Sequence, residues 1–403
     1  MPTTAFSISL TIRREKSPIL ALAISPQTVS KPYAFVGKLV QQFLHRLIRR
    51  LRGYTDAKLL IVSRCVIGVD LGGTNVRAGA FYEDGSPAGK QFENPSHAQK
   101  GTEAIFDALA GTIRQAMGAA ESKPEAVGLA IPGHIDNAAG IVRWAPNFGQ
   151  EVDGVFESWF DVPVRAPLSK HIDIPIFMDN DANMAALGEY RYGCGKGAAK
   201  SFVMVTMGTG IGGGVILSPD AVLGDARGPL VLVGGNKGGA ELGHIIVNMD
   251  GLDCNAGTYG TVEAYCQRDA IVRRAQFKII RGRASALTEL SEGNPSSITP
   301  RMIFEACEAG DEVAIETFRE VGTILGVGVA NYINIFAPDI VAIGGQVSKA
   351  GKWLLDPIFQ SARSNAITSL FRDCEIRLAE QVEDAGMLGG AALAFEAQKW
   401  AKS

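Results

Sequence analysis

The sequence predicts a protein of the α/β class in which two similar halves face each other across a cleft. The chain of 403 residues is long enough for two or three domains, each with its own core. Residues 66–81 and 202–217 each consist of a β-strand, a glycine-rich turn and a second strand, and they lie about 135 residues apart. A further apolar strand, residues 174–178, runs directly into a helix. We interpret the two hairpins as equivalent parts of duplicated halves.

The composition excludes several classes of protein. A formal net charge of −3 argues against a general nucleic-acid binder. All apolar runs are shorter than the ~18 residues that a membrane span requires. The six cysteines are scattered and too few for a disulfide scaffold, which indicates a reducing compartment. We therefore expect a cytoplasmic protein without membrane or nucleic-acid partners.

Residues 1–64 differ in charge from the rest of the chain. Residues 1–55 carry nine Lys or Arg and a single acid, Glu15. Apolar residues at helical spacing between Val36 and Leu51 are interleaved with basic ones, which predicts one basic amphipathic helix. We expect the leader to be disordered or to form this single helix. Three interpretations remain open: a transit peptide for organelle import, a membrane-surface helix, or an appended leader that contributes nothing to the fold.

The first glycine-rich hairpin is a candidate phosphate site. Its first strand, Val66 to Val69, ends in Asp70. The turn exposes backbone N–H groups, and glycine lets them approach phosphate oxygens because it has no Cβ and allows positive φ. Asp70 stands where it can hold Mg²⁺ through bound water, since hard cations prefer carboxylate oxygens. An ordinary hairpin with a polar turn is the alternative. The turn residues are Gly72, Gly73, Thr74 and Asn75.

The second hairpin and a later glycine pair indicate the same kind of ligand. The second turn contains Gly208, Thr209 and Gly210. Gly344 and Gly345 end a strand that follows a predicted helix at 311–336, and they would let a base or ribose lie against the backbone. No Lys-Ser/Thr pair follows the glycines of either hairpin, which excludes a P-loop, and neither turn leads into the helix of a dinucleotide fold. Together the segments predict a cleft for nucleotide phosphates.

Residues 175–192 contain the candidate catalytic base. An apolar strand runs into Asp179-Asn180-Asp181, and a helix follows. At the mouth of a cleft, Asp181 can accept the proton of a hydroxyl that attacks a γ-phosphate. Asn180 can donate to and accept from neighbouring hydroxyls. For Asp179, a helix N-cap and a functional role both remain open.

Residues 240–263 are a candidate site for a polyhydroxylated ligand. Glu241 and His244 lie three residues apart, and Glu263 begins the next helix. Carboxylates and imidazoles suit a sugar, because each hydroxyl donates one hydrogen bond and accepts others. Two alternatives remain open: a metal site of Glu241, His244 and Cys254, and a purely structural role for His244.

These motifs resemble those of the ROK sugar kinases, in particular the ROK glucokinases. The resemblance covers about residues 65–395, and the motifs follow one another in order and at family-like spacing. Each motif alone is weak, but the ordered set is specific. The matching segments are DLGGTNVR (70–77), GLAIPGHID (128–136), APNF (145–148), DNDANMAALGE (179–189), TMGTGIGGG (206–214), ELGH (241–244), VE (262–263) and AGMLGGAALA (385–394).

The resemblance implies the actin-like ATPase (ribonuclease-H-like) fold, in which two α/β domains with mixed sheets enclose a central cleft. The implied parts are the leader (1–64), a smaller N-terminal domain (65–180), a larger C-terminal domain (181–385) and a C-terminal helix (386–403) that packs back on the N-terminal domain. A homodimer is compatible with the resemblance, although no sequence feature indicates it.

The resemblance also implies the reaction, a step of carbohydrate metabolism in which ATP with Mg²⁺ phosphorylates glucose at its 6-hydroxyl. Asp181 would be the general base. The implied sugar contacts are Asn147, Asn180, Asp181, Glu241, His244, Glu263 and the backbone around Gly133. The implied ATP contacts are Gly72, Gly73, Thr74 and Asn75 in one domain and Gly208, Thr209 and Gly210 in the other. Three further nucleotide-site residues, Asp70, Gly344 and Gly345, are indicated by the sequence pattern itself, apart from the resemblance.

The sequence departs from the family in two places. The family usually carries a CxCGxxGCxE segment whose three cysteines join the His of ExGH to bind a structural zinc. Here Ala256 and Thr261 replace the second and third cysteines, which leaves only His244 and Cys254. A closed structural zinc site needs four protein ligands, so we expect no structural zinc. The second departure is the long stretch 218–239, which we interpret as an inserted loop or hairpin.

Other functions within and beyond the family remain open. Mannose, fructose, N-acetylglucosamine and N-acetylmannosamine differ from glucose by one or two substituents, and ADP or polyphosphate could replace ATP as the donor. Sugar-responsive repressors of the family place a winged helix-turn-helix ahead of the kinase-like part, whereas only about 65 residues precede it here. A filament protein or chaperone-type ATPase would explain the phosphate loops but not the candidate sugar contacts.

Overall fold

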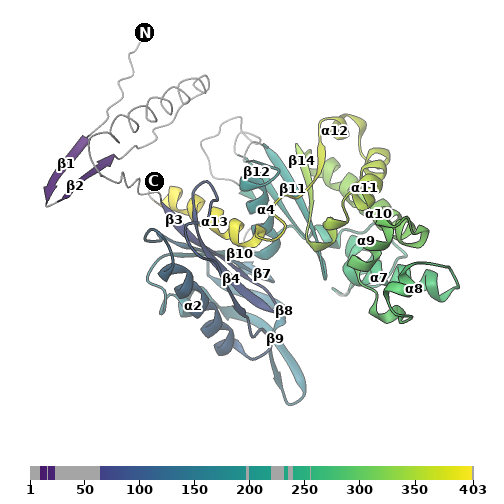
Figure 1. Ribbon diagram of the computed structural model, residues 1–403, viewed down its shortest axis with the longest axis horizontal. Helices are drawn as coiled ribbons and strands as arrows, with labels where there is room; N and C mark the ends of the chain where they lie inside the picture. The colour runs from purple at the N-terminus through teal and green to yellow at the C-terminus, as the bar shows by residue number, and fades with distance from the viewer. Residues whose placement is uncertain are drawn as a thin grey trace, which may run out of the picture. The chain divides into compact units, whose positions relative to one another are not determined.

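The chain forms two units, Met1–Ser63 and Arg64–Ser403, in the computed structural model (Figure 1). The structure describes residues 10–15, 17–22, 64–196, 199–218, 231–234, 239–254 and 256–401. In the first unit, β1 (Leu10–Glu15) and β2 (Ser17–Leu22) form an antiparallel hairpin. The predicted amphipathic helix between Val36 and Leu51 lies outside the described residues.

The second unit contains two mixed sheets of the same topology. The strand orders are β10-β6-β3-β4-β5 and β15-β14-β11-β12-β13. In each sheet an antiparallel hairpin, β3–β4 or β11–β12, is extended by strands that run parallel to its first strand. The repeated pattern confirms the prediction of two similar α/β halves with mixed sheets. We call the part built on the first sheet the N-terminal lobe and the part built on the second the C-terminal lobe.

The strands have the following bounds. The N-terminal sheet consists of β3 (Cys65–Leu71), β4 (Asn75–Tyr82), β5 (Phe92–Pro95), β6 (Val127–Ile131) and β10 (Ile176–Asn180). The C-terminal sheet consists of β11 (Ser201–Met207), β12 (Ile211–Leu217), β13 (Val231–Leu232), β14 (Ile340–Gly344) and β15 (Glu375–Leu378). A third, antiparallel sheet of β7 (His134–Asp136), β8 (Ile141–Val152) and β9 (Val155–Pro163) belongs to the N-terminal lobe.

The central strands are buried because helices cover both faces of their sheet. Val66, Ile67 and Val69 of β3 are fully buried. Ile67 and Val69 belong to a core that includes α2 (Thr102–Gly118), whereas Val66 packs with α13 (Ala385–Ala401). Strands buried on both faces are apolar throughout rather than alternating, which explains the continuous hydrophobic run of β3.

The core of the C-terminal lobe is built around α10 (Glu312–Phe336), which corresponds to the helix predicted at 311–336. Asp311 caps its N-terminus, since the Asp311 side chain accepts a hydrogen bond from the backbone N–H of Ala314 at 2.8 Å. Helices α7 (Arg268–Ile280), α9 (Pro300–Glu308) and α11 (Lys352–Asn365) pack against α10. The remaining helices are α3 (Arg165–Leu168), α4 (Asp181–Tyr192), α6 (Val262–Cys266), α8 (Leu287–Leu290) and α12 (Thr368–Arg372), with short 3₁₀ helices η2 (Leu242–His244), η3 (Pro295–Ser297) and η4 (Gln346–Ala350).

The predicted insertion at 218–239 lies largely outside the described residues. Its described part includes β13, which adds to the edge of the C-terminal sheet beside β12.

Helices α4 and α13 connect the two lobes. Helix α13, yellow in Figure 1, packs on β3 and β6 and also on α4, while α4 packs on β11 and β12. The contact with β6 is a close approach of two backbones: a Cβ atom on Gly128 would lie 1.8 Å from the carbonyl oxygen of Gly390. Only glycine leaves room for this approach. Because α13 also packs on α4, the same contacts place the N-terminus of α4 between the two sheets.

We predict that Gly128→Ala lowers the free energy of unfolding by about 1–3 kcal/mol, because the added methyl group forces β6 and α13 apart. Gly111→Ala is the matched control. Gly111 lies within α2, and a Cβ atom on it would have no neighbouring atom within 4 Å, so alanine there should stabilise the helix by about 0.5–1 kcal/mol. Urea unfolding of both variants measures the difference; equal effects would contradict the close packing.

Candidate active site

A cleft of about 640 Å³ lies between the two lobes. Its lining comes from the end of β3, the β10–α4 junction, the β11–β12 turn, η2, α6 and the first turn of α13. Residues as distant in sequence as Asp70 and Gly345 thus share one cavity. The predicted site residues that line it are Asp70, Gly133, Asn147, Asn180, Asp181, Gly208, Thr209, Gly210, Glu241, His244, Glu263 and Gly345.

Some predicted phosphate contacts lie outside this lining. They are Gly72, Gly73, Thr74 and Asn75 of the first turn, and Gly344 at the end of β14. The first turn is closed by a hydrogen bond from the N–H of Gly72 to the carbonyl of Asn75 (2.8 Å), and the Asn75 side chain donates to Glu93. Of this hairpin, Asp70 therefore reaches the cleft, and the role of its turn stays a prediction.

Gly345 reaches the cleft because its backbone adopts a left-handed conformation, with φ of 79°. A Cβ atom there would lie 2.4 Å from the carbonyl oxygen of Met207, the last residue of β11. Glycine thus lets η4 begin directly beside the β11–β12 turn. The glycine pair and the second hairpin, which the sequence pattern assigned to one ligand, are neighbours in space.

Asn180 fixes the start of α4. Its Oδ1 accepts hydrogen bonds from the backbone N–H groups of Ala182 (2.9 Å) and Asn183 (3.2 Å), which makes Asn180 the N-cap. Its Nδ2 donates to the carbonyl of Gly133 at 3.0 Å. One side chain therefore joins α4 to the loop before β7.

Asp179 is buried behind the β10–α4 junction and holds it in place through hydrogen bonds. It is 1% exposed and does not line the cleft. Its carboxylate accepts hydrogen bonds from Nδ2 of Asn137 (2.9 Å), Nδ2 of Asn183 (3.0 Å) and the backbone N–H of Asn180 (2.7 Å). The N-cap role that the sequence left open for Asp179 belongs to Asn180 instead.

Asp181 begins α4 and faces the cleft. Burial raises the pKa of its carboxyl group, the hydrogen bond from the N–H of Ala182 (2.8 Å) opposes this rise, and the nearby charge of Glu241 adds to it. A carboxylate with a raised pKa binds a proton more readily than an ordinary Asp. This is the property that a general base needs.

Asp70 is another of the carboxylates that line the cleft. Burial, and after it the charge of Asp181, raises the pKa of Asp70 to about 6, while Arg77 opposes the rise. Arg77 is itself engaged by Asp384, at 2.6 Å. The neighbouring carboxylates of Asp70 and Asp181 repel each other and favour a cation between or beside them, so the donor set fits Mg²⁺.

Glu241 lies between two imidazoles. Its Oε1 is 3.4 Å from Nε2 of His134, and its Oε2 is 3.7 Å from Nε2 of His244. His134 comes from β7 in the N-terminal lobe, so this contact crosses the cleft. His134 also packs edge-on against Trp144, and both line the cleft. Neither His134 nor Trp144 was among the predicted site residues; the position of His134 directly after Gly133 was the available signal.

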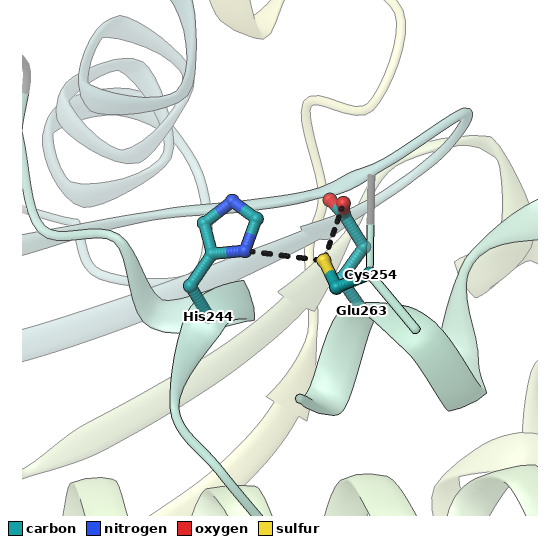
Figure 2. Close-up of side chains that lie close together, drawn as sticks. All are labelled: His244, Cys254 and Glu263. Carbon is teal, nitrogen blue, oxygen red and sulfur yellow. Dashed lines mark hydrogen bonds between the residues drawn. The ribbon is translucent and has the colours of Figure 1, made fainter. Parts of the chain in front are cut away.

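Glu263 is the second residue of α6 and is only 9% exposed. Its Oε2 accepts a hydrogen bond from the backbone N–H of Ile211 (2.8 Å), which ties α6 to the β11–β12 turn. Its Oε1 faces the thiol of Cys254 (3.5 Å), and the same sulfur lies 3.5 Å from Nδ1 of His244, as Figure 2 shows. The potential metal ligands in the described residues are therefore His244, Cys254 and Glu263, rather than the predicted alternative that included Glu241.

The residues present do not fit a closed zinc site with four protein ligands. Thr261, at the third cysteine position of the family, caps α6: its Oγ1 accepts from the backbone N–H of Ala264 at 3.2 Å. Ala256 has no ligand atom in its side chain. The loop is closed by backbone hydrogen bonds instead, including that from the N–H of Cys254 to the carbonyl of Thr258 at 2.7 Å.

The two lobes of matching topology, with carboxylates and a glycine-rich turn in the cleft between them, define a protein of the actin-like ATPase fold. The chain belongs to the ROK family, whose family model matches residues 66–397.

Individual relatives agree with this assignment. The chain is 36% identical to a glucokinase of Thermotoga maritima over 331 residues, which cover 82% of this chain and 97% of that protein. It is 32% identical to a glucokinase of Halalkalibacterium halodurans, over 81% of this chain and 94% of that one. A crystal structure of a ROK family glucokinase from Streptomyces griseus in complex with glucose and AMPPNP matches with a TM-score of 0.67 and 34% identity, over 82% of this chain and 99% of that one. These findings confirm the predicted sugar kinase of the ROK family.

The helices of the described residues are all too short or too polar to cross a bilayer.

We predict that Asp70→Asn stabilises the metal-free protein in a pH-dependent way. The pKa of Asp70 is about 6 in the folded chain and near 3.8 when unperturbed, so its ionisation destabilises the fold fully above pH 6 and not at all below pH 3.8. With chelator present, the variant should gain about 1–3 kcal/mol at pH 8 and almost nothing at pH 4.

Asp84→Asn is the control for this experiment. Hydrogen bonds from the hydroxyl and N–H of Ser86 lower the pKa of Asp84, so its ionised carboxylate stabilises the fold. Asp84→Asn should therefore lower the free energy of unfolding at pH 8. Thermal unfolding at both pH values measures the effects. A destabilised Asp70→Asn variant at pH 8 would contradict the electrostatic account of the cleft.

Proposed function

We propose that the protein is a glucokinase, which transfers the γ-phosphoryl group of ATP to the 6-hydroxyl of glucose with Asp181 as the general base. The observation that carries the proposal is the position of Asp181. It lies at the N-terminus of α4, in the same cleft as the glycine-rich β11–β12 turn and the group of Glu, His and Asn side chains.

The nucleotide is assigned to the side of the cleft formed by Gly208, Thr209, Gly210 and Gly345. The backbone N–H groups of a glycine-rich turn suit phosphate oxygens, because glycine has no side chain of its own to keep them away. Asp70 would hold Mg²⁺ through bound water, and the ion when bound would neutralise charge on the phosphates. The AMPPNP in the Streptomyces griseus structure supports ATP, rather than ADP or polyphosphate, as the donor.

The sugar is assigned to the side formed by η2, α6 and the β8 strand. Glu241, His244, Glu263 and Asn147 offer donors and acceptors for ring hydroxyls, and the side chain of Asn180 and the backbone at Gly133 extend this set. The glucose bound in the Streptomyces griseus enzyme supports glucose as the acceptor over other hexoses and N-acetylhexosamines.

The chemical step follows from these positions. The Asp181 carboxylate accepts the proton of the 6-hydroxyl as that oxygen bonds to the γ-phosphorus and the bond to ADP breaks. Because the sugar contacts come from both lobes, sugar binding would draw the lobes together and exclude water, which limits hydrolysis of ATP.

We predict that Asp181→Asn lowers kcat about 10²–10⁴-fold while the dissociation constant for glucose changes much less. Asparagine keeps the shape and can still accept from the N–H of Ala182, so the loss isolates proton transfer. Asp173→Asn, on the exposed loop before β10, is the control and should leave kcat unchanged. Steady-state kinetics measure kcat for both variants, and calorimetry measures the dissociation constant for glucose. An unaltered kcat in Asp181→Asn would remove Asp181 from the mechanism.

We further predict that Glu241→Ala raises the KM for glucose roughly tenfold or more with a smaller change in kcat, because it removes hydrogen bonds made in the ground state. Glu151→Ala, at an exposed position near the end of β8, serves as the control. Initial rates over a range of glucose concentrations provide the test. If kcat falls while KM stays constant, Glu241 instead stabilises the transition state.

A further inference from the structure

We propose that His134 is a positioning residue of the sugar site, which holds the carboxylate of Glu241 from the opposite lobe and so links sugar binding to closure of the cleft. The proposal rests on the proposed function, because it takes Glu241 as a sugar contact. His134 acts through Glu241 and does not itself touch the reacting atoms.

The contact between His134 and Glu241 joins two walls of the cleft. His134 is the first residue of β7 in the N-terminal lobe, whereas Glu241 directly precedes η2 in the C-terminal lobe. Nε2 of His134 lies 3.4 Å from Oε1 of Glu241, which is close enough for an ion pair. A strong N–H···O hydrogen bond spans about 2.7–3.2 Å, so a small approach of the lobes would bring the pair to that distance.

His134 is fixed within its own lobe. It is paired with Trp144 in the β7–β8 register, and the two rings pack edge-on with their centroids 5.5 Å apart. The backbone directly before it is anchored as well, because Nδ2 of Asn180 donates to the carbonyl of Gly133 at 3.0 Å. The imidazole therefore moves with the N-terminal lobe, and a shift of this lobe is felt at Glu241.

Glu241 needs such a contact because its side chain is 48% exposed. A half-exposed glutamate has several rotamers, and a ligand that binds one of them must overcome the entropy of the others. His134 faces one carboxylate oxygen, and His244 faces the other at 3.7 Å. A carboxylate has about four lone-pair sites, so one that is oriented by two imidazoles can still accept from sugar hydroxyls.

The linkage to closure follows from the two origins of this contact. A sugar hydroxyl that donates to Glu241 binds a carboxylate that the two lobes already share. Exclusion of water from the cleft strengthens the attraction between His134 and Glu241, because the local dielectric constant falls. By thermodynamic linkage, the sugar then favours closure as much as closure favours the sugar. Loss of His134 should therefore weaken sugar binding more than it slows the chemical step.

The test is a kinetic double-mutant cycle of His134→Phe and Glu241→Ala in the full chain. Phenylalanine keeps an aromatic ring against Trp144 but cannot donate a hydrogen bond. We expect His134→Phe to raise the KM for glucose about five- to tenfold, with kcat changed less than about twofold. In the Glu241→Ala protein the same substitution should change KM less than about twofold, because its partner is already gone.

Two further variants separate positioning from packing. His134→Gln keeps an N–H donor but loses the ring, and it should recover most of the sugar affinity. His171→Phe, at an exposed position before β10, makes the same change outside the cleft and should leave KM unaltered. Circular dichroism of each variant establishes that it is folded, and His134→Leu replaces His134→Phe if the latter is not.

An unchanged KM in His134→Phe, or an equal rise in KM with and without Glu241, would overturn the proposal. A glutamine variant as impaired as the phenylalanine variant would do the same. If glucose proves not to be a substrate, the proposed function fails separately, and the same four proteins are compared by urea unfolding instead. Non-additive free energies of unfolding would then support the contact between the two lobes, and additive ones would overturn it.

Discussion

The active cleft depends on the hydrogen bonds of a single side chain, Asn180. The amide oxygen caps α4, and the amide nitrogen holds the carbonyl of Gly133. A helix N-terminus needs such a cap because its first N–H groups lack intrahelical partners. The result is that Asp181, the first residue of α4, is oriented by the helix and anchored to the N-terminal lobe at the same time. Asp179, buried beneath, fixes the backbone of Asn180 and so completes the junction.

Glycine-mediated packing determines where this junction lies between the lobes. The approach of α13 to β6 at Gly128 and Gly390 leaves no space for side chains, and α13 in turn packs along α4. The second lobe is attached through β11 and β12, which also contact α4. The helix that carries Asp181 therefore contacts elements of both halves, as the role proposed for Asp181 requires.

Much of the fold could be predicted, because it follows local rules. The apolar runs and glycine turns around Asp70 and Gly208 define the hairpins, and Asp181 follows a strand directly. What the sequence could not provide depends on contacts between distant segments: His134 facing Glu241, and Glu263 facing Cys254. Whether Asp179 or Asn180 caps α4 depends on the side-chain rotamers and on the carbonyl of Gly133, which binds the amide of Asn180. The first glycine turn was assigned to the cleft, but only Asp70 of that hairpin lines it.

The central claim is that the cleft brings a hexose alcohol to the Asp181 carboxylate beside a bound nucleotide. The most direct measurement is a coupled assay of the purified full chain with ATP and Mg²⁺ against glucose, mannose, fructose, N-acetylglucosamine and N-acetylmannosamine, with the product identified by NMR. The account predicts sugar-dependent ADP formation, the highest kcat/KM for glucose, and glucose 6-phosphate as the product. ADP formation that no sugar stimulates, or phosphorylation at another hydroxyl, would contradict it.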